Sequence, residues 1–179
     1  MKGRTLCKVI ALTESNDNPY ALRFEHAYYQ KLKKRHYSED LVRQYNQCSK
    51  DTAYMIMGTS WGKFQILGVN LYNPLGFRNS IVSYLNDTVT QVRSFKDFVE
   101  LITGENYEDV ANNIIKELDD LLKKRQSMLI QDFREYLANE LPEKMEVVHF
   151  IRRYNGAKYG TSQFLAYLNR MLYHYKMLK

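Results

Sequence analysis

Apolar residues recur three and four positions apart along most of the chain, and this spacing predicts a protein built mainly from helices. The pattern is clearest in the second half, where apolar faces end at residues that stop helices, such as Gly104 and Pro142. The fold class we expect is mainly α, with at most a small β-hairpin. The expected helices cover residues 5–13, 24–35, 51–57 and 87–103, and four later ones have apolar faces marked by 110–121, 129–137, 147–151 and 164–175.

The segment from Gly58 to Val69 interrupts this pattern. The residues 58–62 contain two glycines and end the helix before them. The residues 64–69 fit a short strand and a helical turn equally well, because periodicity cannot decide over six residues.

Length and composition narrow the class of protein. The 179 residues fit a single domain, 1–179, and glycine and proline are scarce (8 and 3), which favours helices. The formal net charge of +6 makes acidic polymers attractive partners, but charge alone does not choose between nucleic acid, anionic lipid and wall polymers. The apolar run after Lys2 and Arg4 is too short for a signal peptide. We therefore expect synthesis in the cytoplasm without a signal peptide, and no membrane insertion.

The cysteines and histidines, residue types that often bind metals, show no recognisable metal-site spacing in this sequence. Cys7 and Cys48 fit neither a disulfide framework nor a zinc motif, so we expect two ordinary thiols, with a single bridge as the alternative. The four histidines have no metal-ligand spacing. We expect no metal and no other cofactor.

Three short segments rich in polar and aromatic residues break the helical pattern: 13–15, 60–66 and 153–156. Taken singly, each has an ordinary interpretation as a solvated helix end, a core tryptophan or a turn. Glu14 lies where the first helix ends, because the turn-forming residues 15–19 follow it. The helix dipole disfavours an anion there and so raises the pKa of a carboxyl group.

In their order along the chain, these segments resemble the goose-type lysozyme and lytic transglycosylase superfamily. Its members have a Glu-Ser at a helix end, then a Gly-Leu-Met-Gln-type segment, then a Tyr-Asn-Gly-type segment. Here these read Glu14-Ser15, Gly62-Lys63-Phe64-Gln65-Ile66 and Tyr154-Asn155-Gly156.

The chain is still more similar to the N-acetylmuramidase domain of modular phage endolysins. The most specific match is the Ser-Trp-Gly-x-Phe-Gln-Ile-x-Gly-x-Asn segment, which is unbroken from Ser60 to Asn70. The resemblance covers about residues 5–103 and 145–175. The weaker matching stretches are Arg23-Phe24-Glu25-His26, then Gln91 with Phe95 and Phe98, and Arg153 to Gly156.

This resemblance implies a lysozyme-like (goose-type) helical domain that cleaves the β-1,4 bond between N-acetylmuramic acid and N-acetylglucosamine in peptidoglycan. Such cleavage needs an acid that protonates the leaving oxygen, and the resemblance assigns this role to Glu14. Amide side chains suit sugar hydroxyl and acetamido groups, and aromatic faces suit pyranose rings. The expected substrate-binding residues are Ser60, Trp61, Gln65, Tyr154 and Asn155, with Tyr159 as a further aromatic face and Trp61 as core packing in the alternative.

A second carboxylate is harder to assign. An inverting hydrolase needs a base that activates water, and Glu25 is the best candidate because it lies in a matching stretch. The alternative is a structural carboxylate bonded to Arg23, His26 or backbone amides. Asp17 is an outside choice that fits a turn better. A lytic transglycosylase would need no second carboxylate, and would form 1,6-anhydro ends.

The segment of about 105–141 is longer than this family usually has before its Tyr-Asn-Gly residues, and it predicts an inserted helical hairpin. This hairpin, with the basic run Lys123–Arg125 between its helices, is either a solvated packing extension or an added surface that binds the wall or a partner. We expect a monomeric phage or prophage endolysin that acts on the cell wall after release by another component, and that does not bind nucleic acid. The rival classes are a basic nucleic-acid-binding protein and a non-enzymatic phage structural protein.

Overall fold

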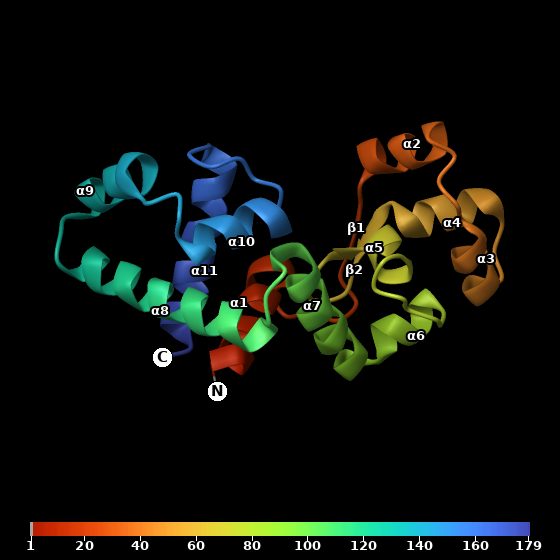
Figure 1. Ribbon diagram of the computed structural model, residues 1–179, viewed down its shortest axis with the longest axis horizontal. Coiled ribbons are helices and arrows are strands. Elements are labelled where there is room, and N and C mark those ends of the chain that lie inside the picture. Colours follow the sequence, from red (N-terminus) through yellow and green to blue (C-terminus); the bar gives the residue numbers. More distant parts are fainter. Residues whose placement is uncertain (1) are drawn as a thin grey trace. The chain divides into compact units, whose positions relative to one another are not determined.

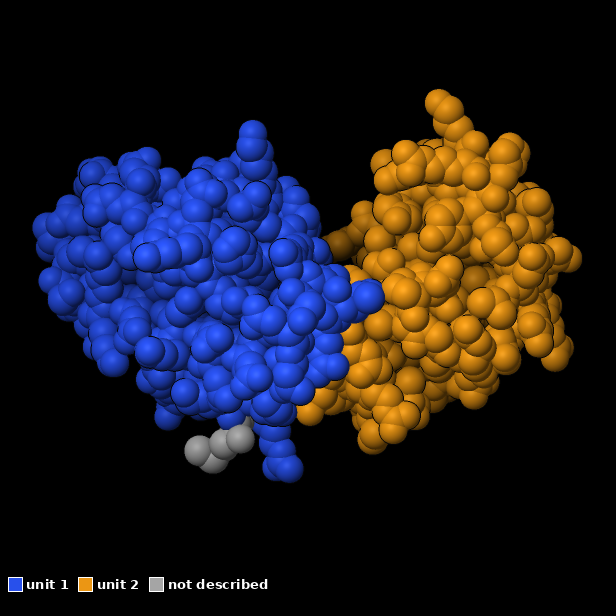
Figure 2. Space-filling model, in the orientation of Figure 1, with its two compact units in different colours: residues 1–13, 99–179 blue, residues 14–98 orange. Residues whose placement is uncertain are grey.

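The structure is a computed structural model and describes residues 2–179 (Figure 1). Within this range it contains eleven α-helices, one short π-helix and three β-strands, so the expected mainly α fold is confirmed. The chain forms two compact units, which Figure 2 colours separately. Unit 1 comprises residues 2–13 and 99–179, and unit 2 comprises Glu14–Phe98. No helix among the described residues is long and apolar enough to cross a membrane.

Unit 1 is built around one long helix, α8, against which α10 and α11 pack (Figure 1). The side chains of Ile114 and Leu118 on α8 are completely buried, as are Val147 and Leu168 on the two partners. The carboxylate of Glu117 accepts hydrogen bonds from the first backbone amides of α10, which helix geometry leaves without partners. The helices of this unit are α1 (Lys2–Ser15, as far as Thr13), α8 (Tyr107–Gln126), α9 (Ile130–Glu135), the π-helix η1 (Tyr136–Glu140), α10 (Glu146–Tyr154) and α11 (Ser162–Met177).

The segment 105–141, predicted to be an insertion, forms α8, α9 and η1. The helix α8 supplies buried side chains to the centre of unit 1, so this part of the segment belongs to the core of that unit. That the segment is an insertion relative to the family stays a prediction.

Unit 2 combines short helices with a small sheet. The strands β1 (Leu22–Phe24), β2 (Thr59–Trp61) and β3 (Ile66–Leu67) pair antiparallel in that order, with Leu22 opposite Trp61 and Trp61 opposite Ile66. The helix α5 packs against β2 and β3, and the buried rings of Phe64 and Phe95 stack with centroids 4.4 Å apart. The helices are α2 (His26–Lys34), α3 (Asp40–Asn46), α4 (Lys50–Met57), α5 (Gly68–Tyr72), α6 (Ile81–Asn86) and the first part of α7 (Thr88–Thr103), which continues into unit 1.

Most of the expected helices are confirmed; in unit 2, one open alternative is decided and three details differ. Phe24 lies in strand β1, so the predicted helix over 24–35 begins later, at His26. Of the ambiguous residues 64–69, the first two lie in a turn, Ile66 and Leu67 form β3, and α5 begins at Gly68. The sheet contains three strands, because β1 pairs with β2, whereas the sequence predicted at most a two-stranded hairpin. The short helices α3 and α6 were not predicted, because six or seven residues carry too little of a helical period.

Candidate active site

Glu14 lies in the last turn of α1 and is half-buried, as the sequence predicted for a helix end. The helix stops because Asn16 and Asp17 adopt left-handed conformations, with φ of 54° and 62°. These are among the few non-glycine residue types that tolerate this region. The backbone amide of Asn18 then donates to the carbonyl oxygen of Ser15 (3.2 Å), which closes the turn. Glu14 is therefore held at the boundary between a helix and a tight loop.

The turn between β2 and β3 carries Gln65. Gly62 begins this turn with φ of 72°, and its backbone amide donates to the carbonyl oxygen of Ala21 (2.8 Å). The backbone amide and the side-chain Nε2 of Gln65 both donate to the carbonyl oxygen of Gly62, at 3.2 and 2.9 Å. The side chain of Gln65 is thus oriented by its own turn. A carboxamide has two amide hydrogens and an acceptor oxygen, so hydrogen-bonding capacity beyond this contact remains.

The loop after Glu14 is bonded directly to this turn. The hydroxyl of Ser15 donates to the carbonyl oxygen of Lys63 (2.8 Å), and the Lys63 ammonium lies 2.8 Å from a carboxylate oxygen of Asp17. The structure therefore brings the segments of Glu14 and Gln65 together within unit 2, although they are about 50 residues apart in the sequence.

Gln91 on α7 braces the same turn from the inside. It is fully buried, and its Oε1 accepts a hydrogen bond from the backbone amide of Lys63 (2.9 Å). Its Nε2 contacts the carbonyl oxygens of Pro19, Tyr84 and Leu85, at 3.1–3.2 Å. From the sequence, Gln91 was recognised only as part of a motif. Its position four residues before Phe95, on the apolar face of a helix, was the signal that it is a buried polar group with fixed partners.

The other two predicted residues of this region differ in accessibility. Trp61 is half-buried and its indole nitrogen donates to the carbonyl oxygen of Ile56 (2.9 Å), so this ring is anchored at the end of α4. Ser60, which was expected to bind substrate, is only 2% exposed in the middle of β2. A side chain this deeply buried supports the sheet and offers little surface to a ligand.

Glu25 occupies the N-cap position of α2, directly after β1, and its side chain makes no capping hydrogen bond. One carboxylate oxygen lies 2.6 Å from Nε of Arg23, and the Glu25 side chain is 35% exposed. Its backbone amide donates to the carbonyl oxygen of Gly58 (2.9 Å), which ties it to the start of β2. Glu25 is therefore oriented by an ion pair and remains accessible.

Tyr154 and Asn155 lie in unit 1, whereas the five other predicted residues lie in unit 2. The ring of Tyr154 stacks on Phe150 with centroids 4.9 Å apart. Asn155 is the C-cap of α10, and its Oδ1 accepts a weak hydrogen bond from Nε2 of Gln163 (3.4 Å). Tyr159, also considered as a stacking face, bonds to the carbonyl oxygen of Leu141 and so takes part in the packing of this unit.

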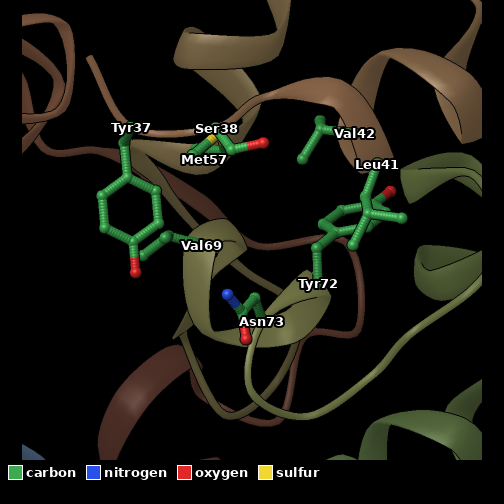
Figure 3. A pocket seen from close by; sticks show the side chains of 8 residues that line it. All are labelled: Tyr37, Ser38, Leu41, Val42, Met57, Val69, Tyr72 and Asn73. Atoms are coloured by element: carbon green, nitrogen blue, oxygen red, sulfur yellow. The ribbon is translucent and has the colours of Figure 1, made fainter.

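A small hollow in unit 2 is lined mainly by apolar side chains from α3, α4, α5 and neighbouring residues (Figure 3). Its volume of about 50 Å³ has room for a few water molecules only, whereas small-molecule sites are several times larger. None of the predicted site residues lines it. Among residues 2–179, no three His, Cys, Asp or Glu side chains are grouped to hold a metal ion.

A mainly α chain with a glutamate at a helix end, next to a small antiparallel sheet whose turn carries a glutamine, has the features of the lysozyme-like class. The family model of the N-acetylmuramidases matches residues 5–178, and the chain belongs to this family. The predicted family is therefore confirmed. The chain is also 39% identical, over 99 residues, to the endolysin of Enterobacteria phage PRD1. That alignment covers 53% of this chain and 66% of the relative. No solved structure matches the chain significantly.

Proposed function

We propose that this chain is an endolysin muramidase that hydrolyses the β-1,4 bond between N-acetylmuramic acid and N-acetylglucosamine, with Glu14 as the general acid. One observation carries the proposal: the loop that follows Glu14 is bonded to the turn that holds Gln65. The segment that carries an acid and the turn that carries a neutral hydrogen-bonding group are thereby joined within unit 2. The family and the endolysin relative support the same assignment.

Glu14 is suited to hold a proton until the glycosidic oxygen takes it. The carbonyl groups at the C-terminal end of α1 carry partial negative charge, which favours the neutral carboxyl group over the carboxylate. Partial burial acts in the same direction, because an anion loses hydration there. A protonated Glu14 donates its proton to the leaving oxygen while positive charge develops on the muramic acid ring.

Gln65 and Trp61 are the substrate-binding residues that we propose for unit 2. The second amide hydrogen and the oxygen of Gln65 are suited to hydroxyl and acetamido groups, since neither competes with Glu14 for a proton. The indole of Trp61 is anchored through its nitrogen, which leaves only the ring surface to contact a sugar. Tyr154 and Asn155 are proposed as sugar-binding residues of unit 1. Ser60 supports β2 in this proposal and is not assigned a contact.

Glu25 is the second carboxylate that we propose for hydrolysis. Its ion pair with Arg23 orients the carboxylate in an accessible position, which suits a group that positions or activates water. Asp17 is a poorer candidate because its side chain is less accessible, 24% exposed against 35% for Glu25. Without an activated water, the muramic acid 6-hydroxyl would attack and give 1,6-anhydro ends.

The test is mass spectrometry of the muropeptides released from purified peptidoglycan by wild type and by Glu14→Gln. We expect reducing N-acetylmuramic ends from wild type, and a rate lower by about 10²–10⁴-fold in the variant, as for the loss of a general acid. Asp97→Asn, an exposed carboxylate on α7, is the matched control and should retain wild-type activity. Near-wild-type activity of Glu14→Gln would refute the assignment. Anhydro ends would indicate a lytic transglycosylase, and no release at all would favour a binding or structural role.

A further inference from the structure

Lys63 joins three segments of unit 2 at one point. Its backbone amide donates to Gln91 on α7, and its backbone oxygen accepts from Ser15. Its ammonium group forms an ion pair with Asp17, in the loop two residues beyond Ser15. The main chain of Lys63 thus holds the turn against α7, while its side chain reaches over the loop that begins at Glu14.

The Lys63–Asp17 pair is shielded compared with other ion pairs of this unit. The two side chains are 18% and 24% exposed, whereas those of the Lys33–Asp51 pair, with the same 2.8 Å separation, are 39% and 72% exposed. Exposed pairs contribute little because water and salt screen them, and shielding strengthens the attraction. The Lys63–Asp17 pair is therefore the better suited of the two to hold a loop in place.

The loop that it holds is short and unusual. Asn16 and Asp17 both have positive φ, a backbone conformation that costs free energy in residues with a side chain. Such a conformation persists only when surrounding contacts fix it. The bonds from Ser15 and Asp17 to Lys63 supply these contacts directly after Glu14.

From this geometry we propose that Lys63 and Asp17 are positioning residues: their ion pair fixes the loop after Glu14, and so sets the position of the Glu14 carboxyl group relative to the turn bearing Gln65. The inference rests on the proposed role of Glu14. Neither residue touches the reacting atoms in this assignment. A general acid displaced by about 1 Å can lose on the order of 10²-fold in rate, so the cost of losing the pair falls on kcat.

Two substitutions remove the pair and leave its surroundings intact. Lys63→Met keeps the aliphatic stem and both backbone hydrogen bonds, and Asp17→Asn keeps a residue that accepts positive φ. Lys63→Arg keeps the charge and serves as the conservative variant. Lys33→Met removes the exposed pair of equal length and is the matched control.

The experiment measures kcat and KM on soluble peptidoglycan fragments well below each variant's melting temperature, with the folded fraction determined by circular dichroism. We expect Lys63→Met and Asp17→Asn each to lower kcat by roughly ten- to a hundredfold with KM within about twofold of wild type. The double variant should be no slower than either single variant, because the two residues act as one unit. Lys63→Arg should recover most of the activity, and Lys33→Met should match wild type.

The outcomes separate this inference from the proposed function. If wild type is active, Glu14→Gln is inactive, and Lys63→Met has a lower melting temperature but an unchanged kcat per folded molecule, the pair is only structural and the inference is wrong. A rise in KM with unchanged kcat would likewise overturn it, since it would place Lys63 in binding. If wild type itself releases nothing, the proposed function fails, and this inference falls with it.

Discussion

The side-chain oxygen of Gln91 lies 2.9 Å from the backbone nitrogen of Lys63 and accepts its hydrogen bond, although the two residues are 28 positions apart. The same carboxamide donates to backbone oxygens of the loop before β1 and of α6. One buried side chain therefore connects the turn of the candidate site to two other segments. Removing it leaves several backbone groups without partners in a place that water does not reach.

We expect Gln91→Ala to lower the free energy of unfolding by about 2–4 kcal/mol, from the lost hydrogen bonds and the cavity left behind. At neutral pH, Gln91→Glu should lower the free energy of unfolding more than Gln91→Ala does, because a carboxylate would face the carbonyl oxygens that now accept from Nε2. Its deficit should shrink as the pH falls and the new carboxyl group becomes protonated. Urea unfolding measures both, and Gln131→Ala on the exposed surface is the control, with a change below about 0.5 kcal/mol.

Gly62 faces Gln91 closely. A Cβ added at Gly62 would lie 2.5 Å from Oε1 and 2.9 Å from Cδ of Gln91, and the backbone there has φ of 72°. Gly76 has almost the same φ, 70°, with no atom within 4 Å of an added Cβ. A comparison of alanine substitutions at these two glycines therefore separates the cost of backbone strain from the cost of a steric clash.

We expect Gly76→Ala to cost about 1–2 kcal/mol from strain alone. Gly62→Ala should cost at least about 2 kcal/mol more, because Gln91 must give up hydrogen bonds to make room. It should also reduce muramidase activity, since the turn of Gln65 moves with it. Equal losses in the two variants, measured by thermal unfolding, would show that Gln91 adapts without cost.

Local pattern was sufficient to predict the helices that have caps and long apolar faces. Gly104 ends α7 in a left-handed conformation, as its place after an apolar face indicated. At the start of α4, the hydroxyl of Ser49 accepts a hydrogen bond from the backbone amide of Thr52. Strand β1 was missed because its three residues, all exposed, show no alternation between buried and exposed positions. Such a strand is defined by its pairing with β2, which is a tertiary contact.

The sequence could predict the candidate site only where a residue's position follows from one continuous segment. The ends of α1 and the unbroken match from Ser60 to Asn70 located Glu14 and Gln65. The contacts of Lys63 with Asp17 and Gln91 join residues 46 and 28 positions apart, and no single segment encodes them. Burial of Ser60 likewise depends on what packs over β2, so its motif position alone indicated a ligand contact that its 2% exposure does not support.

Glu25 and Arg23 give a prediction about the attack of water on the muramic acid ring. If Glu25 orients water, Glu25→Gln should lower kcat by about 10²-fold or more with little change in KM. Arg23→Ala should have a smaller effect, because it removes only the partner of the carboxylate and leaves the carboxylate in place. Steady-state kinetics with product analysis checks this. Two variants with equal, modest losses and equally lowered melting temperatures would indicate that the ion pair only stabilises the fold.

Glu146, at the start of α10, makes the stability of unit 1 depend on pH. Burial, followed by the nearby carboxylates of Glu105 and Glu117, raises its pKa above the ordinary value of 4.5. The folded protein therefore holds this proton more tightly than the unfolded chain does, and ionisation of Glu146 opposes folding once the pH rises above about 4.5. Its contribution favours the folded state only at lower pH.

Glu146→Gln removes this ionisation. At pH 7 the variant should have a higher free energy of unfolding than wild type. This difference should shrink as the pH is lowered below the ordinary carboxyl pKa, where Glu146 is neutral in both the folded and the unfolded state. Chemical unfolding at several pH values between 4 and 7 measures the difference, with Glu135→Gln on exposed α9 as the control that should not show it. A Glu146→Gln advantage that is constant across this range would mean that the gain comes from packing or helix propensity, and that burial beside Glu105 and Glu117 does not penalise the charge.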